Sequence, residues 1–149
     1  MAQLKLTKKL ETLRAALETL QESVSDKKES EHYDEKRYAQ YRDSLIQRFE
    51  YCTDLLWKIL KSYLQVKYGS VPVPAPKPVF KEAYSLGILS DCETELFLEM
   101  IDARNTTSHI YKEEFAEALS RSIPNFYRAM ATLLQRLEAP ASRRSDHQA

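Results

Sequence analysis

The chain has 149 residues, the size of one domain with its own hydrophobic core. It contains only two glycines, which disfavours strand-and-turn folds and glycine-rich phosphate loops. Its 22 lysines and arginines balance 22 acidic residues, so a strongly basic nucleic-acid-binding protein is disfavoured, although a local basic patch is compatible with this balance.

Compartment and cysteine usage give further expectations. The sequence has no apolar run of about 18 residues, so we expect no membrane span. The N-terminus lacks the apolar core of a secretion signal. Cys52 and Cys92 do not have the spacing of metal ligands, and we expect both to be buried and reduced, as in a cytoplasmic protein.

Two long helices are predicted in the first half of the chain. Apolar residues recur in alternating steps of four and three residues from Gln3 to Val24, which predicts an amphipathic helix. The charged stretch 26–35 has no such period and predicts a loop. A second helix is predicted from Asp34 to Tyr68, ended by Gly69. Its broad apolar face predicts packing against several neighbours or a second subunit.

The second half begins with a proline-rich stretch, 70–78, which predicts an extended crossover. A short helix is predicted over 79–86, and a fourth helix begins at a cap, Ser90 or Asp91. A last helical region is predicted from about Lys112 onward, with a break or kink at Pro124. The polar residues 140–149 are predicted to be a disordered tail. The sequence therefore predicts one domain over residues 1–139, an all-α, up-and-down bundle of four to five helices.

The segment 104–111 concentrates chemically capable side chains: Arg104, Asn105, His109 and Tyr111. A guanidinium donates a planar fork of hydrogen bonds to phosphate and stays charged. A histidine exchanges a proton near neutral pH. A charge stabiliser and an acid or base suffice for a metal-free attack on a phosphodiester, so Arg104, Asn105 and His109 are the candidate catalytic residues.

Simpler interpretations of these residues stay open. Arg104 could form a surface salt bridge with Asp102 or Glu99, and Asn105 and His109 could be polar residues at a helix end. However, Arg104 continues the apolar face of the fourth helix, where an unpaired charge is costly. On an ideal helix, Arg104 and His109 point about 140° apart, so they converge only if the chain leaves the helix or if two subunits share the site.

The second helix offers two weaker candidates. Its basic residues could line a phosphate groove or form a solvated face; they are Arg42, Arg48, Lys58 and Lys61. Trp57 and the neighbouring tyrosines are interpreted as core or dimer surface rather than as base-stacking platforms. No cluster of carboxylates and histidines indicates a metal site, and no cofactor is expected.

Two segments resemble known families. Arg104, His109 and Tyr111 match the R-x4-H-x-Y signature of the HEPN superfamily. The segment Tyr41 to Gly69 resembles the second helix of the nucleotidyltransferase substrate-binding protein family, with I-Q-R-F-E at 46–50 and W-K-x-L-K at 57–61. The resemblance extends over about Leu4 to Leu137.

The resemblance implies a dimeric bundle with a small nucleotidyltransferase as partner. In toxin–antitoxin members the bundle is the toxin and cleaves RNA without metal. Arg104, Asn105 and His109 match the active-site positions, and Tyr111 matches the tyrosine that the nucleotidyltransferase antitoxin can adenylylate. Two alternatives remain open: a non-catalytic subunit that binds a substrate or nucleotide for the nucleotidyltransferase, and a polar network that serves only the dimer interface.

Overall fold

The protein is an all-α bundle in a computed structural model that describes residues 1–107 and 113–139. Within this part of the chain the regular elements are helical. They are α1 (Ala2–Glu29), a 3₁₀ turn η1 (Ser30–His32), α2 (Glu35–Tyr68), α3 (Pro76–Ser85), α4 (Asp91–Asn105) and α5 (Glu113–Glu138). The predicted fold class is confirmed.

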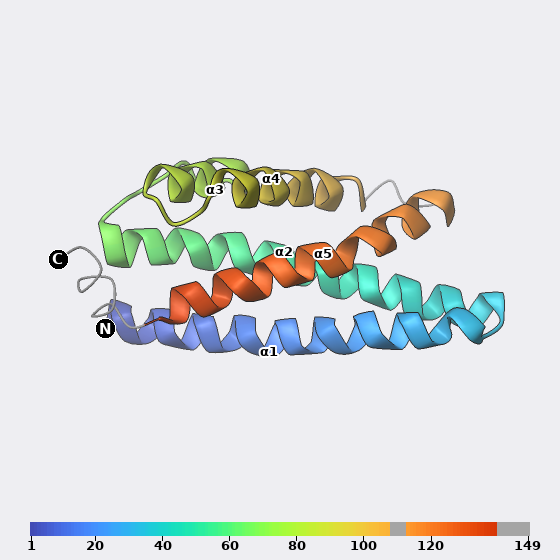
Figure 1. The fold of residues 1–149 in the computed structure, drawn as a ribbon. Helices are drawn as coiled ribbons and strands as arrows, with labels where there is room; N and C mark the ends of the chain where they lie inside the picture. Colours follow the sequence, from blue (N-terminus) through green and yellow to red (C-terminus); the bar gives the residue numbers. More distant parts are fainter. Residues whose placement is uncertain (108–112, 140–149) are drawn as a thin grey trace.

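The helices form an elongated, layered bundle (Figure 1). α1 and α2 run antiparallel over most of its length, and α5 crosses back along both of them. The shorter α3 and α4 pack beside one half of α2, on the side away from α1. α2 is therefore the central helix, in contact with every other helix, which fits the broad apolar face predicted for it.

The core follows the predicted periodicity. Leucines of the α1 seam are buried against α2 and α5. Phe49 of α2 stacks on Phe126 of α5 with ring centroids 5.7 Å apart, and Phe80 of α3 stacks on Phe97 of α4 at 4.9 Å. The first pair joins α2 to α5, and the second joins α3 to α4.

The first helix is longer than predicted. α1 continues to Glu29, and the 3₁₀ turn then leads almost directly into α2, so the predicted loop over 26–35 is mostly helical. The inward-facing positions Ser23, Lys27 and Ser30 are buried although they are polar. The inward-facing positions therefore continue at helical spacing past Val24, but polar residues occupy them, so apolar periodicity does not indicate this part of the helix.

The proline predictions were also partly wrong. α3 begins at Pro76 rather than at residue 79, because proline is well suited to the first turn of a helix. α5 continues through Pro124 without a break. Buried Ile123 and Phe126 flank this proline, and their packing holds the helix together where one backbone hydrogen bond is lost.

Two smaller expectations had different outcomes. Ser90 caps α4 through a reciprocal capping box with Glu93, as one of the two predicted caps. Cys52 is buried, but Cys92 in the first turn of α4 is exposed, so the prediction of two buried cysteines was wrong for Cys92. No helix in the described residues is long and apolar enough to cross a membrane.

Candidate functional site

Arg104 connects the end of α4 to the middle of α2. Its Nε lies 3.1 Å from Asp54 Oδ1, and its Nη2 lies 3.0 Å from Asp54 Oδ2. Both N–H groups therefore donate to the same carboxylate, the paired geometry for which a guanidinium is suited. The Arg104 side chain is 28 % exposed, so the site is neither sealed in the core nor freely solvated.

A second carboxylate completes the cluster. Arg104 Nη1 lies 3.1 Å from Glu50 Oε2 and donates to Thr107 Oγ1 at 2.9 Å. The Thr107 hydroxyl lies 2.9 Å from Glu50 Oε2 and 2.8 Å from the Arg104 carbonyl oxygen, either of which can accept its single proton. We call Arg104, Thr107, Glu50 and Asp54 the arginine cluster.

The electrostatics of this cluster keep the arginine charged. The hydrogen bond to Asp54 raises the pKa of Arg104 above its ordinary value; partial burial opposes this, and the charges of Asp54 and Glu50 add to it. One guanidinium faces two carboxylates, so the cluster is formally one charge negative when all three groups are ionised. An incoming phosphate would therefore approach Arg104 beside two negative charges.

The helix α4 ends directly after two of the candidate residues, Arg104 and Asn105. Asn105 is the last residue of α4 and is exposed, and Thr106 is the cap. Thr106 keeps right-handed helical angles, and Thr107 follows in a 3₁₀ conformation. The predicted site residues His109 and Tyr111 lie outside the described residues, as do the predicted start of the last helix at Lys112 and the predicted tail over 140–149.

The alternative of a surface salt bridge between Arg104 and Asp102 does not occur in the structure. Asp102 pairs instead with Lys77 of α3, with 2.6 Å between Nζ and Oδ1. Sequence analysis did not single out Glu50 and Asp54 as partners. A signal was present, because two acidic residues one turn apart on a helix repel each other unless a cation lies between them.

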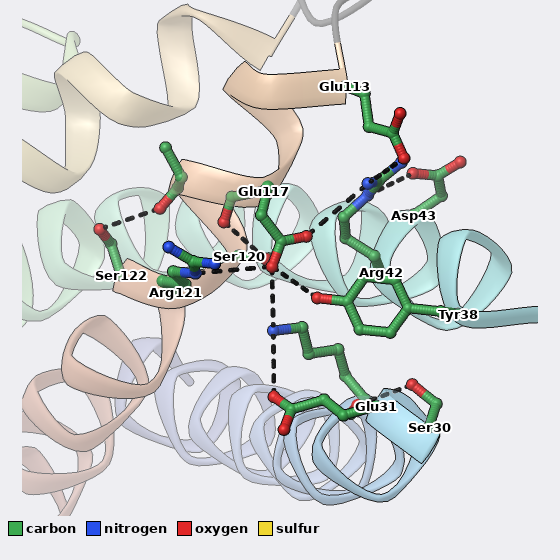
Figure 2. A network of polar contacts seen from close by, with 12 residues as sticks. Ser30, Glu31, Tyr38, Arg42, Asp43, Glu113, Glu117, Ser120, Arg121 and Ser122 are labelled. Atoms are coloured by element: carbon green, nitrogen blue, oxygen red, sulfur yellow. Dashed lines mark hydrogen bonds and ion pairs between the residues drawn. The ribbon is translucent and has the colours of Figure 1, made fainter. Parts of the chain in front are cut away.

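A second polar network lies at the far end of the bundle, where α5 begins. Figure 2 shows Glu117 at its centre, with Tyr38, Arg42 and Arg121 directed toward it. The Tyr38 hydroxyl donates to Glu117 Oε1 at 2.5 Å, while Lys27, Arg42 and Arg121 have nitrogens 3.5–3.7 Å from its carboxylate. The network joins α1, α2 and α5.

The protonation of this network follows from its charges. Burial alone would raise the pKa of Glu117, but the hydrogen bond from Tyr38 and the three cations together lower it below its ordinary value. Arg42 is buried and also faces Glu113 and Asp43, so it belongs to this structural network and not to a solvent-facing phosphate groove. No group of metal-ligating side chains occurs among the described residues.

Comparison with protein families identifies the family. The family described as nucleotidyltransferase substrate binding protein like matches residues 8–139, nearly the whole described chain. The chain belongs to this family. The match includes most of α1, all of α2 to α5, the arginine cluster and the polar network around Glu117.

Individual relatives agree with the family assignment. A probable ribonuclease HepT from Haemophilus influenzae is 30 % identical over 95 residues, which are 62 % of this chain and 64 % of that protein, less than two thirds of its length. A crystal structure from Thermus thermophilus is 37 % identical with a TM-score of 0.74, covering 85 % of this chain and 99 % of that one.

Two further solved structures share the fold. A Haemophilus influenzae protein described as the substrate binding domain of a nucleotidyltransferase is 25 % identical, with a TM-score of 0.75 and coverage of 87 % of this chain and 99 % of that one. A tri-AMPylated HEPN toxin from Shewanella oneidensis, in complex with its MNT antitoxin, is 14 % identical, with a TM-score of 0.70 and coverage of 91 % and 97 %. The latter likeness concerns the fold alone.

Proposed function

We propose that this chain is a HEPN-type toxin, a metal-independent endoribonuclease that acts in the cytoplasm and is neutralised by a cognate nucleotidyltransferase. The observation that carries the proposal is the position of Arg104. It stands at the end of α4, oriented by Asp54 and partly open to solvent, five residues before His109. The ribonuclease name of the Haemophilus relative and the toxin fold of the Shewanella protein support the same interpretation.

The reaction needs no nucleophile from the protein. The 2′-hydroxyl of the RNA attacks the adjacent phosphorus, a 2′-O–P bond forms, and the bond to the 5′-oxygen of the next nucleotide breaks. His109 accepts the proton of the 2′-hydroxyl or protonates the departing 5′-oxygen. Arg104 stabilises the charge on the non-bridging phosphate oxygens, and Asn105 orients His109 or the phosphate. The products are a 2′,3′-cyclic phosphate and a free 5′-hydroxyl.

Glu50 and Asp54 act as positioning residues in this scheme. They hold the guanidinium in one orientation before RNA arrives, which lowers the entropy lost when the phosphate is bound. Phosphate then replaces one carboxylate as the acceptor. A homodimer would bring two copies of the 104–111 segment together and provide the second acid or base.

Neutralisation is proposed to occur at Tyr111. Its hydroxyl attacks the α-phosphorus of ATP in the nucleotidyltransferase, the bond between the α- and β-phosphates breaks, and pyrophosphate leaves. The added AMP places negative charge and bulk two residues from His109, where it opposes binding of RNA phosphate.

A non-catalytic role is the second candidate, favoured by two observations. The Arg104 guanidinium is already paired with Asp54 and Glu50. A Haemophilus structure of the same fold is described as a substrate binding domain. In this role the bundle would present a nucleotide or protein substrate to its nucleotidyltransferase and would not cleave RNA.

The two candidates are separated by measuring RNA cleavage and intact mass before and after incubation with the cognate nucleotidyltransferase and ATP. We expect cleavage by the protein alone, and its loss together with the mass gain of one or more AMP groups. Tyr111→Phe is expected to stay active and to lose a modification site. A stable complex without cleavage or mass gain would contradict the toxin and support the substrate-binding role.

A further inference from the structure

A basic groove lies between α1 and the second half of α2. It has a volume of about 500 Å³ and contains no carboxylate among the residues that line it. Lys9 of α1 and Lys58 and Lys61 of α2 contribute three positive charges, and Trp57 contributes an indole ring. In a chain whose net charge is zero, this concentration of one sign is a local feature.

The charge of the groove is not neutralised by nearby acids. Lys9 Nζ donates to the hydroxyl of Ser62 at 2.9 Å, which bridges α1 and α2 with a neutral acceptor. Further along the two helices, Lys67 Nζ donates to the Gln3 side-chain oxygen at 2.9 Å in the same manner. Within the described part of the chain, no carboxylate forms an ion pair with Lys9, Lys58 or Lys61. These ammonium groups are therefore available to bind an anion.

The groove also contains an aromatic surface beside its cations. Lys58 Nζ lies 5.8 Å from the centre of the Trp57 ring, close enough for a cation–π contact. Trp57 is partly buried, so the ring is held in place by the protein. A cationic groove with a fixed aromatic ring fits single-stranded nucleic acid, in which phosphates and unstacked bases alternate.

Two lysines of the groove follow the arginine cluster along the α2 sequence. Lys58 follows Asp54 by one helical turn, and Lys61 follows by two, which places them roughly 6 and 10 Å along the helix axis from the partner of Arg104. Arg104 reaches α2 from α4, whereas the groove lies between α2 and α1, so the two features are neighbours along the same helix on different sides of it. We propose that the α1–α2 groove binds single-stranded RNA, with its lysines on the phosphates and Trp57 against a base.

This inference rests on the proposed ribonuclease function, and it concerns a surface separate from the catalytic residues. It can be tested without cleavage by using a 2′-O-methyl RNA oligonucleotide, which lacks the nucleophilic hydroxyl. Trp57 is the single tryptophan of the chain, so its fluorescence reports directly on this groove. We expect saturable quenching of Trp57 fluorescence as the oligonucleotide is added, weakened by salt.

The lysines are tested with a Lys9→Gln, Lys58→Gln, Lys61→Gln triple variant. Each phosphate contact on a single strand contributes about 0.7 to the slope of log affinity against log salt, so the slope should fall by about 2. Lowering the salt from about 200 to about 50 mM strengthens binding by a certain factor, and this factor should be roughly 20-fold smaller for the triple variant than for the unchanged protein. The matched control replaces the exposed lysines Lys28, Lys36 and Lys81 by glutamine, which changes net charge equally and should leave the slope near that of the unchanged protein.

Several outcomes would contradict the proposal that this groove binds RNA. An unchanged slope in the triple variant, or RNA binding that leaves Trp57 fluorescence unaltered, would place the RNA elsewhere while the ribonuclease proposal stood. Loss of a dimer by the triple variant in sedimentation would instead make this face an interface between copies of the chain. Absence of any RNA binding or cleavage by the unchanged protein would contradict the groove and the ribonuclease together.

Discussion

Arg104 of α4 and Asp54 of α2 are joined by two parallel hydrogen bonds, 3.1 Å from Nε to Oδ1 and 3.0 Å from Nη2 to Oδ2. The two residues are fifty positions apart in sequence, so this pair fixes where the end of α4 lies against the central helix. α4 ends at the next residue, Asn105, and His109 and Tyr111 follow shortly after it in the sequence. The pair thus holds the end of α4 against α2 and also orients Arg104, a proposed catalytic residue.

The pair should be energetically coupled. Asp54→Asn and Arg104→Ala are each expected to lower the free energy of unfolding by about 1 kcal/mol, because the pair is only partly exposed. In the Arg104→Ala background, Asp54→Asn should cost less, since it relieves repulsion from Glu50, giving a coupling of roughly 0.5–1 kcal/mol. Urea denaturation of the four proteins measures this cycle.

Asp102→Asn is the matched control for this cycle, because Asp102 pairs with Lys77 on an exposed surface of the same helix. Its effect should be additive with Arg104→Ala. Strict additivity of Asp54→Asn with Arg104→Ala would show that the two parallel hydrogen bonds contribute nothing in solution.

The Glu117 network should make stability depend on pH on the acid side. The pKa of Glu117 is lowered in the folded protein, so its contribution is fully present above its unfolded pKa of about 4.3 and is lost as pH falls through the lower folded value. Glu117→Gln should therefore be less stable than the unchanged protein at pH 7, and the difference should narrow toward pH 3.

Denaturation at a series of pH values from 7 to 3 measures this effect. Glu114→Gln provides the control, because Glu114 is exposed in the same turn of α5. A Glu117→Gln difference that stayed constant over this range would mean that Glu117 is not held as a carboxylate by Tyr38 and its cationic neighbours.

The two cysteines should differ strongly in reactivity. Burial raises the pKa of Cys52 to about 12, and its thiol lies 3.4 Å from the Ala16 carbonyl oxygen, whereas Cys92 is exposed. Because the thiolate is the reactive form, a maleimide at neutral pH should label Cys92 first and Cys52 only on unfolding. Intact mass over time should show one addition, and Cys92→Ser should show none; rapid labelling of Cys52 would contradict the packing of α1 on α2.

The aromatic contact between α2 and α5 should be among the largest single contributions to the core. Phe49 is fully buried and stacked on Phe126, so Phe49→Ala should lower the free energy of unfolding by about 3–5 kcal/mol. Tyr51→Ala, two residues away and 55 % exposed, is the control and should cost far less. Equal losses of stability for Phe49→Ala and Tyr51→Ala in urea denaturation would contradict the face of α2 that the structure turns toward α5.

The fold was largely predictable because apolar periodicity carries most of its information. The leucine seam of α1 and the wide apolar face of α2 correspond to buried surfaces. The predicted helix bounds were wrong where packing against other helices, and not an apolar pattern in the sequence, stabilises the helix. Buried Lys27 and Ser30 extend α1 and its turn without an apolar side chain, and Pro124 is tolerated because its helix is anchored on both sides.

The site was predictable only in part, because it joins helices distant in sequence. Arg104 continues the apolar face of α4, where an unpaired charge is costly, and the structure pairs it with a neighbouring helix. That the neighbour is α2, and that Glu50 and Asp54 face it there, depends on which helices pack together. Spacing within a single helix cannot decide this, although the repulsion between the two acids indicates that they need a cation.

The most direct test of the proposed function is RNA cleavage by the purified protein in EDTA, compared among the unchanged chain, His109→Ala and Arg104→Ala. Cleavage by the unchanged chain that leaves 2′,3′-cyclic phosphate ends, and is reduced by at least about 100-fold in both variants, is the predicted result. Cleavage that persists in His109→Ala, or that requires a metal ion, would contradict it.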